Sequence, residues 1–276
     1  MKKLFFIFTI FTFFIIPLFY INASEPIRIL LVPGHDNKIW GAQYGNIKEA
    51  DMNLVLATQI YNLLKADKRF EVWISRDSLG YTKEFADYFS LHRADIISFM
   101  DNAKIKMQDK IDNGSFVEKV DVQHNVATLD MAIKLYGINK WVDENKIDAV
   151  IHVHFNDYPL PNKWSIGKYK GFAIYIPEGQ MVNSQESTQL AKSVFSQLST
   201  KYIPSTYKKE LGGLTPDQNL IGLGSNDTLS ASVRSILIEY CYIYQKIFRD
   251  SVTRHQAYKD MANLTFKGIK NYFFGK

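Results

Sequence analysis

Two histidines and a glutamate, far apart in the sequence, carry the side chains best suited to chemistry. The apolar run IRILLV at residues 27–32 breaks at a Pro-Gly turn and presents His35, and Glu49 begins a helical pattern fourteen positions later. His154 lies near the end of a second apolar run, IDAVIHVHF at residues 147–155. Two imidazoles and a carboxylate are a donor set of catalytic zinc sites, which leave the fourth position to water. We therefore predict that His35, Glu49 and His154 bind Zn²⁺.

A second glutamate interrupts an apolar run near the C-terminus. Glu239 stands within SILIEYCYI, and a carboxylate in a buried strand is unfavourable unless it is paired or functional. A zinc hydrolase also needs a group that accepts a proton from water and returns it to the leaving amine. We assign this catalytic role to Glu239. A buried ion pair with Arg234 is the alternative interpretation.

His152 and Asn156 stand two positions before and after His154. Residues two apart in a strand point to the same face, so both side chains would lie on the side of His154. Asn156 would orient the substrate or a ligand, or it would be a turn residue. His152 would be a packed or supporting histidine that lines the cleft, or it would compete as a metal ligand. We include both as candidate substrate-binding residues.

Strand and helix patterns alternate along the chain. Short apolar runs predict buried strands at 27–32, 70–76, 147–155, 171–177 and 231–243. Helical spacing predicts helices at 50–66, 83–100, 125–146 and 184–200 and a last one that ends near Tyr272. The alternation predicts an α/β fold with a three-layer, mostly parallel twisted sheet flanked by helices. Sites in such sheets gather beyond the carboxyl ends of the strands.

The first 23 residues differ in composition from the rest of the chain. Lys2 and Lys3 precede an almost unbroken apolar run, and Ala23 offers a small residue for cleavage, which is the layout of a secretory signal. An uncleaved membrane anchor is the alternative. We expect residues 24–276 to form one domain that is exported to the periplasm, the cell wall or the extracellular space.

Composition and charge set broad limits. A chain of 276 residues with 46% hydrophobic content can bury one full core. Cys241 is the only cysteine, so no internal disulfide is possible, and we predict that it is a buried strand residue and not a nucleophile. The net charge of +5 falls by two, to +3, without Lys2 and Lys3. A mildly basic domain suits an anionic wall polymer or simply has an ordinary basic surface; we predict no nucleic-acid partner.

Four short motifs occur in order along the chain: PGH at 33–35, KEADMNL at 48–54, HFN at 154–156 and LIE at 237–239. Together they resemble the zinc-dependent N-acetylmuramoyl-L-alanine amidases of the amidase type 3 family, over about residues 27–273. The resemblance implies that His35, Glu49 and His154 are metal ligands and that Glu239 is the catalytic glutamate. It also implies a single zinc amidase domain that hydrolyses the amide bond between N-acetylmuramic acid and L-alanine in peptidoglycan.

The sequence departs from the family pattern in three places. Asp36 follows His35 where the family usually has glycine, and His152 stands where the family typically has serine. Cys241 and Tyr242 stand where the family commonly has glycine and phenylalanine. The change after His35 alters the turn geometry but not the ligand, and the change at Cys241 and Tyr242 affects the floor of the pocket and so the substrate. Two alternatives therefore stay open. The first is a zinc amidohydrolase that acts on another amide, and the second is a catalytically inactive wall-binding or regulatory protein on the same fold.

Residues 90–130 are longer than in the compact version of the family. Within them, residues 101–122 are polar and contain Asp-Asn-Gly, which predicts a loop. Because some family members carry an autoinhibitory insert, the resemblance implies a lid or a docking element for a protein activator. A solvated insertion without a function is the alternative.

Overall fold

The computed structural model describes residues 25–119, 122, 124, 126–157 and 165–275. Its main sheet has six strands: β1 (Ile27–Pro33), β4 (Phe70–Ile74), β7 (Ala149–Asn156), β8 (Ala173–Pro177), β9 (Leu214–Asp217) and β10 (Arg234–Tyr242). The strand order is β4-β1-β7-β10-β8-β9, and of these neighbours only β10 and β8 run antiparallel. The predicted mostly parallel sheet is therefore confirmed.

Two short ribbons and seven helices complete the described fold. The ribbons pair β2 (Gln43–Tyr44) with β3 (Ile47–Lys48), and β5 (Arg76–Asp77) with β6 (Gly80–Tyr81). The helices are α1 (Glu49–Ala66), α2 (Lys83–Leu91), α3 (Arg93–Asp112), α4 (Leu129–Glu144), α5 (Ser184–Leu198), α6 (Lys246–Arg249) and α7 (Ser251–Phe274). Three 3-10 turns, η1 (Lys208–Glu210), η2 (Ile221–Leu223) and η3 (Ser225–Asp227), lie between α5 and β10.

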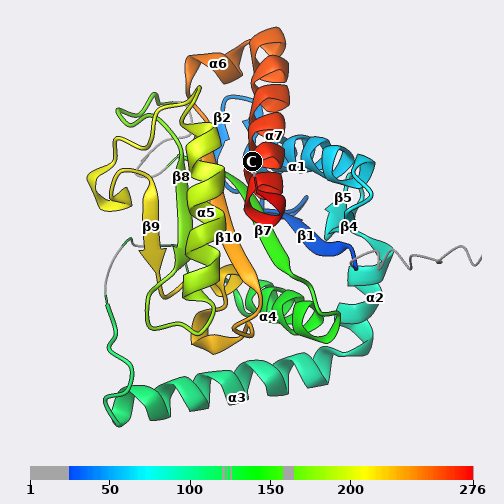
Figure 1. The fold of residues 1–276 in the computed structure, drawn as a ribbon, viewed down its shortest axis with the longest axis vertical. Coiled ribbons are helices and arrows are strands. Elements are labelled where there is room, and N and C mark those ends of the chain that lie inside the picture. Colours follow the sequence, from blue (N-terminus) through cyan, green and yellow to red (C-terminus); the bar gives the residue numbers. More distant parts are fainter. Residues whose placement is uncertain (1–24, 120–121, 123, 125, 158–164, 276) are drawn as a thin grey trace, which may run out of the picture.

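Helices cover both faces of the sheet because successive side chains of its strands point to opposite faces. In β1, Ile29 and Leu31 belong to one buried cluster, and Leu30 and Val32 belong to another. The first cluster is completed by α1, α5 and α7, and the second by α2, α3 and α4 (Figure 1). The predicted three-layer α/β arrangement follows from this division.

The parallel register brings the carboxyl ends of three strands together. β1 pairs Pro33 with Val153 of β7, and β10 pairs Glu239 with His154 of β7. Residues paired in this way on neighbouring parallel strands present their side chains on the same face. The turn after β1 and the ends of β7 and β10 therefore lie side by side at one edge of the sheet.

The predicted loop at 101–122 is wrong over residues 101–112, which form the second half of α3. The helix continues because one of its faces is apolar and buried, at Ile96, Met100, Ala103 and Met107. The polar residues that suggested a loop lie on the opposite, exposed face. The Asp-Asn-Gly sequence does end the helix, and Gly114 adopts a φ of 76°. The predicted helix at 83–100 is divided at His92 into α2 and α3.

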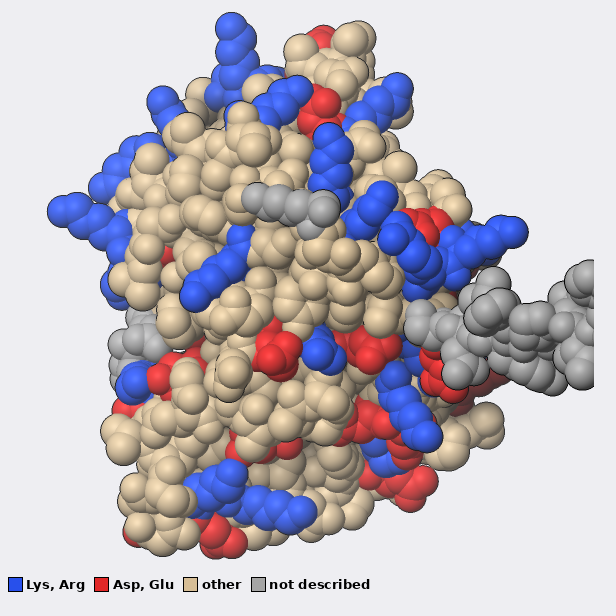
Figure 2. Space-filling model, in the orientation of Figure 1, with Lys and Arg blue, Asp and Glu red and all other residues tan. Residues whose placement is uncertain are grey.

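The predicted signal segment, residues 1–23, lies outside the described residues, so export and cleavage stay predictions. None of the helices in the described ranges is both long enough and apolar enough to cross a membrane. On the face drawn in Figure 2, lysine and arginine side chains spread over the upper part, whereas acidic side chains gather lower down. The basic charge of the domain is therefore distributed unevenly.

Candidate metal and catalytic site

The structure brings the three predicted metal ligands together at the carboxyl ends of β1 and β7. His35 Nε2 lies 3.1 Å from Glu49 Oε2, and His154 Nδ1 lies 3.0 Å from Glu49 Oε1. One donor atom from each residue falls within 4.8 Å of the others. Two imidazoles and a carboxylate that converge in this way can hold a divalent metal ion.

The local fold fixes the Glu49 carboxylate. Glu49 is the first residue of α1 and is only 4% exposed. Its Oε2 accepts a hydrogen bond from Ala42 N (2.8 Å), and its Oε1 accepts from Phe155 N (3.2 Å) and Asn53 Nδ2 (3.2 Å). The helix N-terminus also favours a negative charge at this position. The carboxylate is thus oriented by three donors besides the two histidines.

Asn53 and Arg76 hold the turn that presents His35. Asn53 Nδ2 donates to Gly34 O at 3.0 Å. The buried Arg76 guanidinium donates to three backbone carbonyls, those of Pro33 (3.1 Å), Gly34 (3.0 Å) and Ala50 (2.5 Å). Neither side chain was predicted to belong to the site. For Asn53 the signal was its spacing, because it follows Glu49 by one helical turn and so shares its face.

Glycines allow the backbone to approach the ligand side chains closely. A Cβ atom on Gly34 would lie 2.1 Å from Cε1 of His154. Gly41 has a φ of 70°, and a Cβ atom there would lie 2.3 Å from Oε2 of Glu49. His35 itself adopts a left-handed φ of 61°, a conformation that is uncommon for non-glycine residues and that recurs at functional sites. The loop is therefore shaped around these three side chains.

Glu49 determines the charge of the two imidazoles. Burial lowers the pKa of His35, but attraction to the Glu49 carboxylate outweighs burial and raises that pKa overall. For His154 burial dominates, and its pKa is lowered despite the hydrogen bond to Glu49. Burial alone would raise the pKa of Glu49, yet the two imidazoles hold it well below its usual range. The site thus contains an ionised carboxylate and a His154 ring that favours the neutral, metal-binding form.

Glu239 lies beside His154, and its Oε2, unlike the oxygens of Glu49, has no hydrogen-bond partner among the described residues. The two residues are paired in the register of β10 and β7. Oε2 of Glu239 is buried and accepts no hydrogen bond from the described residues. Burial, together with the negative charges of Glu49 and Glu210, raises the pKa of Glu239 well above its usual value. A carboxyl group with raised proton affinity beside candidate metal ligands is a candidate for proton transfer.

The alternative ion pair between Glu239 and Arg234 is not formed. Arg234 begins β10, and five residues of strand separate the two side chains by roughly 16 Å. The Arg234 guanidinium instead lies 3.4 Å from Glu186 Oε2 and donates to Tyr272 OH at 2.9 Å. Glu239 therefore keeps no structural salt bridge with this arginine.

His152 and Asn156 have different surroundings. His152 is 2% exposed, and its ring packs so closely on Gly222 that a Cβ atom there would lie 2.5 Å from its Cε1. Burial and the nearby His154 lower the pKa of His152 to about 3, and the group that could hold a metal does not include it. Asn156 Nδ2 donates to Glu210 Oε1 at 2.8 Å. A substrate-binding role for either residue stays a prediction.

A cleft of about 630 Å³ opens beside His35 and His154. Its walls are mostly apolar and come from the loop after β1, from α4 and from η2, through Ile39, Trp40, Met131, Leu135 and Ile221. Residues 126–128, at the end of the predicted insertion, also line it. The insertion therefore reaches the cleft that contains the candidate ligands.

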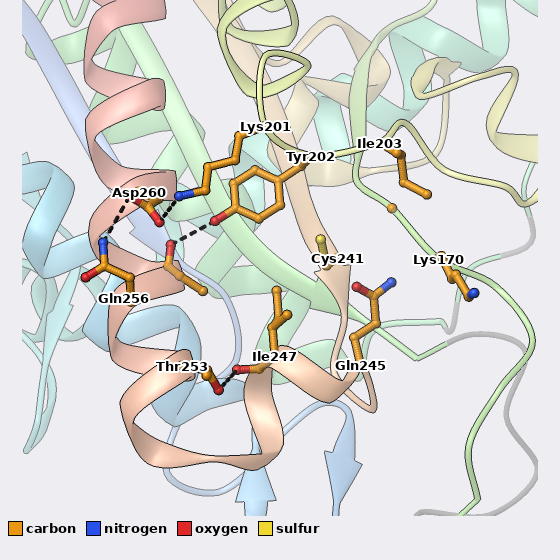
Figure 3. A pocket seen from close by; sticks show the side chains of 12 residues that line it. Lys170, Lys201, Tyr202, Ile203, Cys241, Gln245, Ile247, Thr253, Gln256 and Asp260 are labelled. Carbon is orange, nitrogen blue, oxygen red and sulfur yellow. Dashed lines mark hydrogen bonds and ion pairs between the residues drawn. The ribbon is translucent and has the colours of Figure 1, made fainter.

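A second cavity, of about 500 Å³, lies on the α5 and α7 side of β10 (Figure 3). Cys241, Tyr202 and Gln245 line it, but none of the candidate ligands does. Cys241 is a buried residue of β10, as predicted, and burial raises the pKa of its thiol. The chemistry of the candidate site therefore belongs to the first cleft.

Comparisons with known proteins agree with this arrangement. A family model described as N-acetylmuramoyl-L-alanine amidase, amidase type 3, matches residues 29–271. A search of curated proteins finds no match. Similar solved structures include the N-acetylmuramoyl-L-alanine amidase of Clostridium difficile 630 (TM-score 0.56, 16% identity, covering 92% of this chain and 100% of that chain).

Two further structures are the CwlD amidase of Clostridioides difficile in complex with the GerS lipoprotein and the Ami1 amidase of Mycobacterium smegmatis. The first has a TM-score of 0.55 and 16% identity, and it covers 89% of this chain and 98% of that chain. The second has a TM-score of 0.55 and 14% identity, and it covers 91% of this chain and 99% of that chain. At these identities the structural likeness concerns the fold alone.

Arg76→Lys should weaken zinc binding by about 10- to 100-fold, because lysine keeps the charge but cannot reach three carbonyls at once. Zinc affinity is measured by competition with a chromophoric chelator. Arg249→Lys is the matched control, since Arg249 also donates its guanidinium to a backbone carbonyl, that of Tyr244, outside the site. Equal zinc affinities in the two variants would contradict the role of Arg76.

The free energy of unfolding should fall as the pH drops from about 6.5 toward 3, because the unfolded chain protonates His152 and the folded chain does not. The contribution of this one residue reaches at most about 1.4 kcal/mol per pH unit. His152→Leu should flatten the pH dependence in this window by that amount. Urea unfolding at several pH values measures it, and an unchanged slope would show that His152 titrates normally in the folded state.

Proposed function

The chain belongs to the amidase type 3 family of N-acetylmuramoyl-L-alanine amidases, and from this premise we propose that it is a zinc hydrolase acting in cell-wall remodelling or cell separation. Its reaction is hydrolysis of the amide bond between N-acetylmuramic acid and L-alanine in peptidoglycan. The observation that supports this most strongly is the grouping of His35, Glu49 and His154 within 4.8 Å, with Glu239 paired to His154 on the next strand.

The three grouped side chains would hold zinc through two imidazole nitrogens and one carboxylate oxygen, and this leaves a fourth position open. Zinc at such a site would supply Lewis-acid chemistry, which lowers the pKa of bound water to about 7. Glu49 is already ionised, and its oxygens are fixed by Ala42 N and Phe155 N. His154 favours its neutral form. Glu49 and His154 are therefore in the protonation states that metal binding requires, whereas metal binding would displace a proton from His35, whose pKa is raised.

Glu239 would accept the proton of the attacking water and pass it to the leaving amine of L-alanine. Its carboxyl group lies on the face of His154 and has an unpartnered buried oxygen. Burial and the nearby negative charges raise the pKa of Glu239 and so increase its affinity for the proton that it would transfer. His152 and Asn156, on the same strand face, are the proposed contacts to the substrate.

Glu239→Gln should lower the rate of peptidoglycan hydrolysis by about 100- to 10,000-fold, because glutamine cannot take up the proton. Its zinc content should equal that of the wild type, whereas His154→Ala should lose both zinc and activity. Residues 24–276 are incubated with purified peptidoglycan, with and without chelator, and new amino-terminal L-alanine is quantified by mass spectrometry.

Products without a new L-alanine amine would exclude the proposed bond and favour an amidohydrolase for another amide. A wild-type chain that binds no zinc and is unaffected by Glu239→Gln would favour the inactive wall-binding protein. Both outcomes are read from the same samples.

We also propose that the domain acts outside the cytoplasm, where peptidoglycan lies. The signal-like composition of residues 1–23 supports this, and an uncleaved segment would tether the domain to a membrane. A solved amidase of similar fold is in complex with a lipoprotein. By analogy, the exposed face of α3, within residues 90–130, is a candidate docking surface for a protein activator.

Ile105→Glu should abolish stimulation by such an activator without changing basal hydrolysis, because Ile105 is a large apolar side chain, 60% exposed, on α3. The measurement is peptidoglycan hydrolysis with and without a membrane extract of the producing cells. Ile203→Glu is the matched control, since Ile203 is 56% exposed and lies outside the insertion. Equal stimulation of both variants, or none in the wild type, would argue against this surface.

A further inference from the structure

Glu210, at the end of η1, is a buried carboxylate that the proposed reaction does not use. It is 1% exposed. Its Oε1 accepts hydrogen bonds from Asn156 Nδ2 (2.8 Å) and Tyr175 OH (2.9 Å). Its Oε2 accepts from Tyr242 OH (3.1 Å) and from Ser205 Oγ. Within the described residues it forms no salt bridge, so neutral donors alone stabilise a charge that is expensive to bury.

Three of these donors stand on neighbouring strands of the sheet. Asn156 ends β7, two residues after His154, and Tyr242 ends β10, three residues after Glu239. Tyr175 belongs to β8, which pairs with β10 on its other side. A single carboxylate therefore connects β8 with the ends of β7 and β10, and these ends lie two or three residues beyond His154 and Glu239.

The strand that carries Glu239 is irregular immediately after it. β10 keeps a regular register with β7 up to the pair Glu239 and His154, and the register then shifts before the pair Tyr242 and Asn156. Cys241, inside this irregularity, has a φ of 145°, which is rare for a residue with a side chain. Irregularities of this kind redirect side chains beside active sites, and they persist only when surrounding contacts hold them.

Contacts on both faces of the sheet hold the irregular segment. On the α7 side, Tyr240 OH and Thr265 Oγ1 form a hydrogen bond of 2.7 Å. On the site side, Tyr242 OH donates to Glu210. The cavity of Figure 3 borders the same segment at Cys241, so apolar packing there is incomplete. These polar contacts add to the burial of Tyr240 and Tyr242 in the core, and together they restrain the direction of the Glu239 side chain.

We propose that Glu210 is a positioning residue, which keeps the Glu239 carboxyl group beside His154 by fixing the ends of β7 and β10. The proposal rests on the function proposed above. A carboxylate suits this task because its two oxygens accept four hydrogen bonds, whereas the amide of glutamine replaces one acceptor with a donor. Misplacing a catalytic group by about 1 Å can reduce a rate by about 100-fold.

Glu210→Gln, in the zinc-loaded chain, should lower kcat by about 10- to 100-fold and leave KM and zinc content nearly unchanged. Tyr242→Phe removes one of the four donors and should lower kcat in the same direction by about 3- to 10-fold. Glu178→Gln is the matched control. Glu178 is also a buried glutamate, 6% exposed, bonded to Lys119, Gln180 and Gln218, but it follows β8 at the opposite edge of the sheet. The Glu178→Gln variant should keep the wild-type kcat.

Crystal structures of the three variants separate this proposal from the proposed function. Glu239 should move relative to His154 in Glu210→Gln and Tyr242→Phe but not in Glu178→Gln, whatever the substrate is. An unmoved Glu239 with a wild-type kcat in the Tyr242→Phe and Glu210→Gln chains would overturn the positioning role. A similar loss of kcat in Glu178→Gln would show that the loss in Glu210→Gln comes from lower overall stability, and this would also overturn the positioning role. A displaced Glu239 in a protein that does not cleave peptidoglycan would leave the positioning role intact and remove only the assigned substrate.

Discussion

The buried carboxylate of Glu49 is the interaction on which the rest of the site depends. It joins the loop after β1, the start of α1 and the end of β7, because it contacts His35, Ala42 N, Phe155 N and His154. An ionised group at 4% exposure is tolerated only when such partners surround it. The parallel register of β1 and β7 brings these partners to one edge of the sheet. The arrangement that could hold a metal ion is thus a consequence of stabilising one buried charge.

Much of this arrangement could be predicted from the sequence because it depends on local patterns. The alternation of apolar runs with helical spacing gave the layers and the mostly parallel sheet. His35, His154 and Glu239 could be identified because each breaks or ends an apolar run, and Glu49 could be identified because it begins a helix. Residues at strand ends of a parallel sheet converge whatever their separation along the chain.

The remaining features depend on contacts between distant residues, which no local pattern contains. Arg76 belongs to the site only because β5 passes beside the carbonyls of Pro33 and Gly34. Glu210 gains its role from donors on three strands, so its position in the sequence gives no hint of it. The loop predicted at 101–122 failed for a different reason. The exposed polar face of α3 dominates its composition, and its four buried apolar residues are a minority.

Two glutamates within one site acquire different properties because their surroundings differ. Two imidazoles hold the pKa of Glu49 below its usual range, so it stays ionised, and backbone amides fix its oxygens. Glu239 has a buried Oε2 that receives no hydrogen bond from the described residues, and burial together with the negative charges of Glu49 and Glu210 raises its pKa. When the surroundings of two carboxyl groups push their pKa values apart, one group stays ionised and the other can exchange a proton. The register of β7 with β10 sets this division, because it places the Glu239 carboxyl group beside His154 and within reach of the negative charge of Glu49.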